Sequence, residues 1–310
     1  MPRFSRALVT GAAGFIGSGV SRRLLEAGLE VVGLDDFSNS DEATVPPGVK
    51  FFRGSVMDPM VIREAIDGVE VVLHFAARIG TRASTMDFVG DGETNIIGTL
   101  NLLSLAVDAG VTRFIYPSSA AVYGAVGPGV MISEEHELNP LSPYGVSKLA
   151  AEMYVSRICM ANGIDFLILR YFNVYGPGQK YGPYAGVITV FTKRVLNNEP
   201  LVLFGDGEQI RDFVHVDDVV QATALAVGSD LRSEVLNIGT GKPCSVNRLA
   251  TLVISSLNSP LEPVRNGTFE QEIKYSLADT RKAKELLGFF ARKDLDAGIC
   301  ETITWIKSVL

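Results

Sequence analysis

Tyr144 and Lys148 stand four residues apart in SPYGVSKLAAE, which spans residues 142–152. The stretch opens with Ser-Pro and then reads as a helix, so one helical face would carry both side chains. An ammonium beside a phenol favours the phenolate and lowers the pKa of the phenol. We therefore expect Tyr144 to act as a base near neutral pH and to take a proton from an alcohol that is being oxidised.

A Tyr-x-x-x-Lys pair alone is a weak signal, but an upstream hydroxyl extends it. Ser119 lies at the end of a predicted strand in FIYPSSAAVYG. A hydroxyl in this place could hydrogen-bond the substrate oxygen. The candidate catalytic set is therefore Ser119, Tyr144 and Lys148.

A glycine-rich turn lies near the start of the chain, in VTGAAGFIGSGV. Gly11, Gly14 and Gly17 follow the first predicted strand and open the first predicted helix, the context in which this spacing binds a dinucleotide. Gly11 would allow the tight turn, Gly14 the close approach of a pyrophosphate, and Gly17 the packing of helix on strand. A glycine-rich turn without a ligand is the alternative.

The second predicted strand ends in LDDFSNS, which places Asp35 18 residues after Gly17. A carboxylate here accepts hydrogen bonds from the ribose of an adenine dinucleotide and repels a 2′-phosphate. No Arg or Lys occupies 36–40, so NAD is favoured over NADP. Its nicotinamide, when oxidised, is a second cation beside Tyr144. Alternatively, Asp35 or Asp36 only caps a loop.

Short apolar runs alternate with amphipathic stretches in the first half of the chain. The runs predict strands at 7–10, 30–34, 49–53, 69–75, 113–118 and 165–172, with helices at 15–28, 58–67, 91–109 and 144–162. Repeated β-α-β units predict an α/β fold with a doubly wound parallel (Rossmann) sheet. After 172 we expect a loop, helices near 187–197 and 217–227, and strands at 201–204 and 234–238.

Two interleaved units follow from this pattern. We expect a dinucleotide-binding domain at 1–175, with 211–238 returning to it, and a smaller α/β substrate domain at 176–310.

Bulk properties exclude several classes of protein. The formal net charge of −7 argues against binding nucleic acid or an anionic membrane. Three scattered cysteines and three histidines form no metal-binding motif, so no metal is expected. Neither a signal peptide nor a membrane-spanning stretch is indicated, and we expect a cytoplasmic protein.

Five motifs in this order, TGAAGFIG, HFAA, SSAAVYG, SPYGVSK and RYFNVYGP, resemble the extended short-chain dehydrogenase/reductase family. Within it the chain is similar to the NAD-dependent nucleotide-sugar epimerases, of which those acting on UDP-glucose are the nearest type. The resemblance covers essentially the whole chain. It implies 4-epimerisation through a transient 4-keto sugar, with hydride lent to bound NAD and returned to the other face of the sugar.

The resemblance also implies site residues. Tyr144 is the base, Lys148 holds the nicotinamide ribose, and Ser119 is the catalytic hydroxyl. The expected NAD-binding residues are Gly11, Gly14, Phe15, Ile16, Gly17, Asp35, Asp36, Asn39, Ser55, Val56, Phe75, Ala76, Ala77, Asn95, Ser118, Tyr144, Lys148 and Tyr171. The expected residues for the nucleotide sugar, most simply a UDP-sugar, are Ser119, Ala120, Tyr144, Asn173, Val202, Phe204, Arg211 and Ser276.

Some positions depart from the family pattern. Ser55 stands where an Asp usually reads the adenine amine, and Ile79 replaces a Lys. Phe269 stands where a second phosphate-binding Arg is expected; whether Arg265 replaces it is open. For Arg211, a surface ion pair with Asp206 or Asp212 is the alternative.

The residues after Ser119 separate related chemistries. Family members that dehydrate sugars resemble STDEVYG here, whereas this chain has Ala120 and Ala121, whose methyl groups cannot supply an acid and a base. Simple epimerisation is therefore preferred. A net nucleotide-sugar reductase or dehydrogenase, an epimerase for another sugar nucleotide such as UDP-glucuronate, and a non-catalytic dinucleotide sensor are the alternatives.

Two further expectations come from the resemblance. Ser276 matches a position where a bulky Tyr excludes N-acetyl sugars, so its small side chain would admit UDP-GlcNAc and UDP-GalNAc as well. A homodimer would form through the helices at 91–109 and 144–162. These offer the apolar residues Leu100, Leu103, Val107, Met153 and Ile158, which alternatively face their own sheet.

Overall fold

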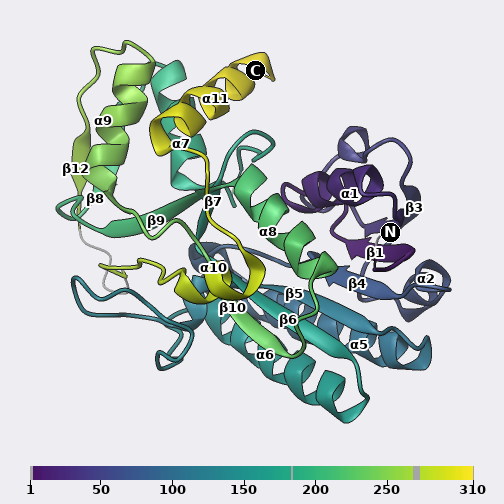
Figure 1. The fold of residues 1–310 in the computed structure, drawn as a ribbon. Helices are drawn as coiled ribbons and strands as arrows, with labels where there is room; N and C mark the ends of the chain where they lie inside the picture. Colours follow the sequence, from purple (N-terminus) through teal and green to yellow (C-terminus); the bar gives the residue numbers. More distant parts are fainter. Residues whose placement is uncertain (1–2, 183, 268–272, 310) are drawn as a thin grey trace.

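The computed structural model describes residues 3–182, 184–267 and 273–309, and within them seven strands form one parallel sheet (Figure 1). The strand order is β10-β6-β5-β4-β1-β2-β3, so the winding reverses between β1 and β4. The strands are β1 (Arg6–Thr10), β2 (Glu30–Asp35), β3 (Lys50–Arg53), β4 (Val71–His74), β5 (Arg113–Ser119), β6 (Asp165–Tyr171) and β10 (Glu234–Ile238). The prediction of a doubly wound parallel sheet is confirmed.

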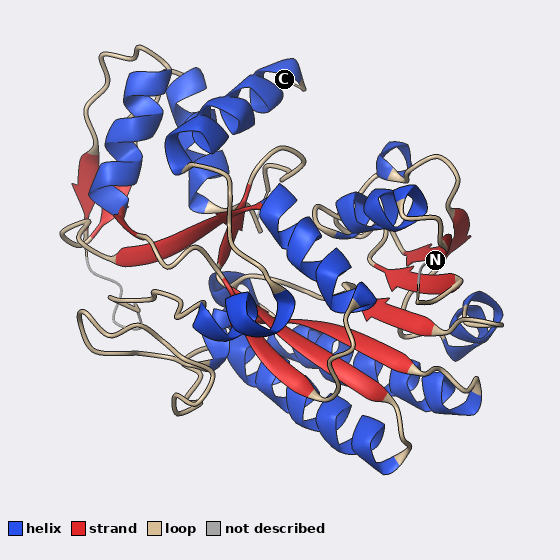
Figure 2. Cartoon of the chain, viewed as in Figure 1, coloured by secondary structure: helices blue, strands red, loops and turns tan. Residues whose placement is uncertain are grey.

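Helices cover both faces of this sheet, as Figure 2 shows. One face packs on α1 (Gly17–Glu26), α8 (Val216–Gly228) and α10 (Arg281–Leu287). The other packs on α2 (Pro59–Ala65), α5 (Gly98–Asp108) and α6 (Pro143–Ala161). Successive residues of β1 face opposite cores, Ala7 and Val9 one and Leu8 the other. Burial on both faces explains why the strands read as continuous apolar runs.

A smaller unit lies beyond the carboxyl ends of the strands. In it β9 (Ile210–His215) pairs with β7 (Asn173–Tyr175) and β11 (Pro243–Ser245), while β8 (Val202–Phe204) pairs with β12 (Val264–Asn266). Three helices, α7 (Val187–Leu196), α9 (Val246–Ser256) and α11 (Leu295–Ser308), share its apolar core. The chain then interleaves the two units, because α8 and β10 return to the large sheet while β9 stays in the small one.

Arg113 of β5 ties α8 to the large sheet. Its guanidinium is fully buried and donates to the carbonyls of Ala226, Val227, Ser229 and Leu231 at 2.7–3.2 Å. These carbonyls lie at the C-terminal end of α8, where helix geometry leaves acceptors unsatisfied and the helix dipole is negative. One buried cation therefore fixes the C-terminal end of the returning helix to β5.

The predicted single helix at 91–109 is wrong in detail. The chain forms α4 (Phe88–Gly92), a π-helical turn η2 (Glu93–Ile97), and only then α5. A π turn inserts one residue per turn and is frequent at functional sites. Asn95 lies inside this turn and is buried.

Among the described residues, no helix combines the length and apolarity needed to span a membrane.

Candidate active site

The glycine turn joins β1 to α1 with little space to spare. Gly11 has a φ of +67°, and a Cβ there would lie 2.8 Å from the backbone of Phe75 and Ala76. A Cβ on Gly17 would lie 2.1 Å from the carbonyl oxygen of Gly11. A Cβ on Gly14 would lie 3.1 Å from that same oxygen. Side chains at Gly11 and Gly17 would therefore clash with the surrounding backbone, so the close packing of this turn requires glycine.

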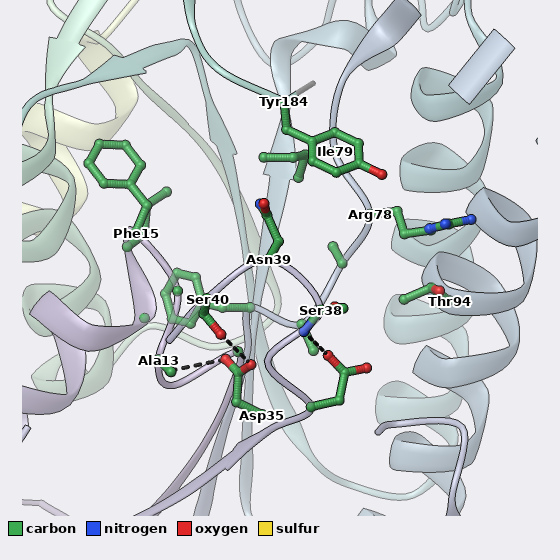
Figure 3. A pocket seen from close by; sticks show the side chains of 18 of the residues that line it. Ala13, Phe15, Asp35, Ser38, Asn39, Ser40, Arg78, Ile79, Thr94 and Tyr184 are labelled. Carbon is green, nitrogen blue, oxygen red and sulfur yellow. Dashed lines mark hydrogen bonds between the residues drawn. The ribbon is translucent and has the colours of Figure 1, made fainter. Parts of the chain in front are cut away.

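A first cavity of about 520 Å³ opens above this turn, where the winding of the sheet reverses (Figure 3). Open α/β sheets bind ligands at this place. Thirteen of the predicted NAD-binding residues line it: Gly11, Gly14, Phe15, Ile16, Gly17, Asp35, Asp36, Asn39, Ser55, Val56, Phe75, Ala76 and Ala77. The fold thus brings together residues drawn from four separate βα junctions.

Asp35 has a fixed orientation at the edge of this cavity. Its Oδ1 accepts from the backbone N of Phe37 at 2.9 Å and from Ser40 Oγ at 2.7 Å. Its Oδ2 accepts from the backbone N of Ala13 at 3.0 Å (Figure 3). The carboxylate therefore caps its loop and also lines the cavity, where Oδ2 retains acceptor capacity for a ribose hydroxyl.

Three predicted NAD-binding residues are missing from the described lining of the first cavity, and two more, Tyr144 and Tyr171, line a neighbouring cavity. Asn95, Ser118 and Lys148 are buried. None of them is among the described residues that line the first cavity. The hydroxyl of Tyr171 shares a 2.7 Å hydrogen bond with Thr223 of α8, so it faces away.

Asn95 acts as a structural link between the cavity wall and α6. Its Oδ1 accepts from the backbone N of Arg78 at 2.9 Å, and its Nδ2 donates to Asp91 and Ser147. Ser147 in turn donates to the carbonyl of Tyr144 at 3.0 Å. The π turn that carries Asn95 therefore fixes the segment after β4 relative to the start of α6.

His74 completes this internal chain and cannot serve as a base. It lies between Thr10 Oγ1 at 2.8 Å and Thr99 Oγ1 at 2.9 Å, and Thr99 donates to the carbonyl of Asn95. Burial, and secondly the charge of Lys148, lower its pKa to about 3. The imidazole is therefore neutral at any physiological pH.

Sequence analysis did not identify several residues that line the first cavity. Arg78, Gln179, Lys180 and Tyr184 all line it. Figure 3 shows Tyr184 over Ile79, with Arg78 on the side opposite Phe15. Lys180 forms an ion pair with Asp41, on the loop after β2. The glycine- and proline-rich segment after β7 predicts a loop, but no local pattern shows that the loop returns across the cavity.

A second cavity, of about 570 Å³, lies between the large sheet and the smaller unit. All eight predicted substrate residues line it: Ser119, Ala120, Tyr144, Asn173, Val202, Phe204, Arg211 and Ser276. Tyr184 lines both cavities, so the two adjoin. Arg82 also lines the second cavity, with its guanidinium 4.3 Å from the centre of the Phe204 ring, and no sequence motif marks it.

Two of the three predicted catalytic residues, Ser119 and Tyr144, line this cavity, and Lys148 does not. The Ser142 side chain caps α6 by accepting from the backbone N of Gly145 at 3.2 Å, and Pro143 occupies the first turn. Tyr144 follows at once, and its backbone N donates to Ser84 Oγ at 3.1 Å. Ser119 ends β5, and its hydroxyl is a hydrogen-bond partner that lowers the pKa of Tyr144.

The predicted effect of Lys148 on Tyr144 is wrong for the protein by itself. Burial raises the pKa of Tyr144 to about 12, and Lys148 is not among the groups that shift it. The Lys148 ammonium lies 4.5 Å from the centre of the Tyr116 ring. Desolvation of the phenolate thus outweighs the expected charge effect, and lowering the pKa requires a further positive charge near the phenol.

The second cavity contains no carboxylate among its described lining residues. Ala120 and Ala121 both line it, where a dehydrating site would need an acid and a base. Asp212 lies close by but is occupied: it accepts from the backbone N atoms of Thr240, Gly241 and Ala278.

The open question about Arg265 has a plain geometric answer. Arg265 is exposed on β12 and donates to the carbonyls of Gly205 and Asp206. It is absent from the described residues that line the second cavity. Phe269 lies outside the described residues.

The described residues bring one group of metal-ligand types together, His215, Asp217 and Glu301. The Nδ1 atom of His215 accepts from the backbone N of Asp217 at 3.2 Å, and Lys293 Nζ lies 2.7 Å from Glu301. This group is therefore paired with other protein groups, and it lines neither cavity.

Comparison with known proteins agrees with this geometry. Residues 7–239 match the NAD dependent epimerase/dehydratase family. The UDP-glucose 4-epimerase of Mycolicibacterium smegmatis is 35% identical, over 98% of this chain and 99% of that protein. The crystal structure of Thermotoga maritima UDP-glucose 4-epimerase with UDP-glucose superposes with a TM-score of 0.94 at 37% identity, covering 98% of this chain and 99% of that one.

A third similar protein acts on an acetamido sugar. It is the UDP-N-acetylglucosamine 4-epimerase from Methanobrevibacter ruminantium M1, in complex with UDP-N-acetylmuramic acid. Its TM-score is 0.93 at 30% identity, and each chain is covered over its full length.

The ionisation of Tyr144 can be measured directly. In protein stripped of bound small molecules, the phenol should titrate at a pH of about 12, because burial disfavours its charged form. Ser119→Ala should raise this pKa further, because it removes a hydrogen bond that favours the phenolate. Carbon-13 NMR of ring-labelled tyrosine, assigned with Tyr144→Phe, measures both values. A Tyr144 pKa at or below its ordinary value of 10 would contradict the dominance of burial.

Proposed function

The chain belongs to the NAD dependent epimerase/dehydratase family, and on that premise we propose that it is a UDP-sugar 4-epimerase. The proposed substrates are UDP-glucose and UDP-galactose, and also their N-acetylated counterparts. The observation that carries the proposal is the convergence of Ser119 and Tyr144 on a cavity that adjoins the dinucleotide cavity and has no carboxylate among its described lining residues. Such a cavity supports removal and return of hydrogen at one carbon but not dehydration.

The first cavity fits NAD. Gly11, Gly14 and Gly17 line it without side chains, and α1 begins at Gly17, so the start of this helix lies at the cavity. Asp35 would bind the adenosine ribose, and Lys148 would hold the nicotinamide ribose. When bound, NAD supplies reversible hydride transfer at the sugar carbon and a positive charge near Tyr144.

The residues of the chain then have distinct tasks. Tyr144 removes the proton of the sugar 4-hydroxyl and later returns one, and Ser119 holds the same oxygen by a hydrogen bond. The pKa of Tyr144, which burial raises, would fall beside the positive charge of a bound oxidised nicotinamide. Arg211 binds the diphosphate, since a guanidinium matches phosphate geometry, while Val202 and Phe204 meet the nucleotide base. The 4-keto sugar turns within the second cavity before hydride returns.

A product assay without added cofactor tests this function. The purified protein should interconvert UDP-glucose and UDP-galactose by itself, because an epimerase regenerates its cofactor in every cycle. The panel also holds UDP-glucuronate and GDP-, CDP- and dTDP-sugars, and chromatography identifies the products. Turnover that depends on stoichiometric NAD(P)H would show a net reductase instead.

Replacing the base tests the mechanism. Tyr144→Phe should lower kcat by about 10²- to 10⁴-fold, the usual contribution of a positioned general base, while NAD stays bound. Tyr154→Phe is the matched control, because Tyr154 lies on the same helix and is 44% exposed. Undiminished turnover in Tyr144→Phe would overturn the assignment.

Ser276 is the proposed determinant of acceptance of N-acetyl sugars. It lines the second cavity and is 7% exposed, so a larger side chain there would project into the cavity. Ser276→Tyr should reduce turnover of UDP-GlcNAc at least about tenfold and spare UDP-glucose. Ser276→Ala should keep both substrates. Equal losses for both sugars in Ser276→Tyr would contradict this role.

We also propose a cytoplasmic homodimer. The described cysteines Cys159, Cys244 and Cys300 are free thiols, as expected in a reducing compartment. Of the apolar residues predicted to form the dimer contact, Leu103 is instead buried in its own core, and Val107 and Ile158 pack against that core. Met153 is 61% exposed.

An exposed apolar stripe on α6, formed by Val146, Met153 and Met160, supports the dimer instead. Val146 and Met160 lie seven residues before and after Met153 and are 52% and 60% exposed. Residues at this spacing share one helix face. An apolar face of this kind is typical of a protein contact.

Disrupting this stripe should separate the subunits. Met153→Asp places a charge in the centre of the proposed interface and should yield a monomer by light scattering at micromolar concentration. Met60→Asp is the control, because Met60 is 68% exposed on α2, away from the stripe. A monomeric unmodified protein would refute the dimer.

A further inference from the structure

Glu152 follows Lys148 by one helical turn on α6, and the proposed mechanism gives it no role. Tyr144, Lys148 and Glu152 are spaced four residues apart, so they lie along one face of the helix. Lys148 and Glu152 are each only 4% exposed. A carboxylate and an ammonium are thus both withdrawn from water directly behind the catalytic phenol.

Glu152 is held by a buried arginine from the central sheet. Arg170 of β6 donates from Nε to Glu152 Oε1 at 3.0 Å and from Nη2 to Oε2 at 2.7 Å. This bidentate ion pair fixes the plane and the position of the carboxylate. The remaining amino group, Nη1, donates to the hydroxyl of Tyr123 at 2.9 Å, which donates to Asn237 of β10 at 2.7 Å. The carboxylate is thereby anchored to two strands.

The charged and titratable groups around Lys148 come from several elements. They are Tyr144 and Glu152 on α6, Tyr116 on β5, His74 on β4 and Asp91 on α4, with Arg170 on β6 behind Glu152. His74 is neutral, and the Tyr116 hydroxyl stays protonated because burial raises its pKa. Glu152 and Asp91 therefore supply the negative charge that faces the ammonium.

The two carboxylates are not equivalent. Asp91 accepts from Asn95 Nδ2 at 3.2 Å, and burial raises its pKa, which disfavours its charged form. Glu152 is paired with the guanidinium of Arg170, a permanent cation. Burial lowers the pKa of Lys148 to about 8, against which Glu152 is the largest opposing influence.

We propose that the buried Arg170–Glu152 pair is a positioning device for Lys148: Arg170 fixes Glu152, and Glu152 keeps the ammonium charged and in place beside Tyr144. A charged Lys148 can donate three hydrogen bonds to the ribose of the cofactor, whereas a neutral amine is a weaker donor. The catalytic consequence rests on the proposed epimerase function, but the effect on Lys148 does not.

The charge of Lys148 is the decisive readout. Protein labelled with carbon-13 at lysine Cε is titrated by NMR, and Lys148 is assigned by its absence in Lys148→Met. The unmodified protein should show a midpoint of about 8. Glu152→Gln should move it down by about one pH unit or more, because an opposite charge at this range shifts a pKa by that much.

A second variant keeps the test valid if Glu152→Gln fails to fold. Glu152→Gln leaves the guanidinium of Arg170 buried without its partner, which destabilises a protein. The double variant Glu152→Leu/Arg170→Met removes both charges together and should also lower the Lys148 midpoint, by less than the single variant. Asp218→Asn is the control, since Asp218 is a buried carboxylate on α8 that accepts hydrogen bonds from the backbone N atoms of Arg292 and Lys293. It should leave the midpoint unchanged.

The pH profile of turnover links this effect to catalysis. The alkaline limb of kcat/KM should move to lower pH in Glu152→Gln and return toward its original place in Glu152→Asp. An unmoved Lys148 midpoint in a folded double variant would overturn the proposal even if the protein epimerises UDP-sugars. A moved midpoint in a protein that turns over no sugar would support the pair and refute the proposed function instead.

Discussion

A buried positive charge is the constraint on which the rest of this site depends. Lys148 is withdrawn from water beside Tyr144, and the cost of removing an ammonium from water is several kcal/mol unless other groups offset it. The ring of Tyr116 and the carboxylates of Asp91 and Glu152 provide that compensation. The same burial raises the pKa of Tyr144. The protein by itself therefore keeps the Tyr144 phenol protonated, and the proposed function assigns the lowering of its pKa to the charge of the bound cofactor.

The doubly wound sheet determines where this helix face can act. The reversal of winding between β1 and β4 opens the first cavity, and the ends of β5 and β6 place Ser119 and Tyr171 at the second. The smaller unit, which contributes β8 and β9, closes the second cavity from the other side. A substrate between the two units thus meets Tyr144 at the boundary with the dinucleotide cavity, so one carbon can lie near both.

Much of the polar interior serves orientation. His74 is locked between two threonines, and Asn95 connects the segment after β4 with Ser147 on α6. Arg113 and Arg170 fix α8 and α6 to neighbouring strands. Buried polar groups that are fully paired specify a single arrangement at little net gain in stability. Their value lies in holding reacting groups in place, which is where the family chemistry needs precision.

The sequence by itself determined the parallel sheet and the glycine turn, and it predicted Ser119, Tyr144 and Lys148 as the catalytic candidates, because each of these rests on a short local pattern. Apolar runs, glycine spacing and a four-residue helical interval are local patterns. The tertiary structure decided the π turn around Asn95, the return of the Tyr184 loop across the cavity, and the position of Arg82 over Phe204. Burial in the tertiary structure also raises the pKa of Tyr144, where the sequence predicted a lowered pKa. Desolvation and long-range contacts arise only when distant segments pack together, and no local pattern records them.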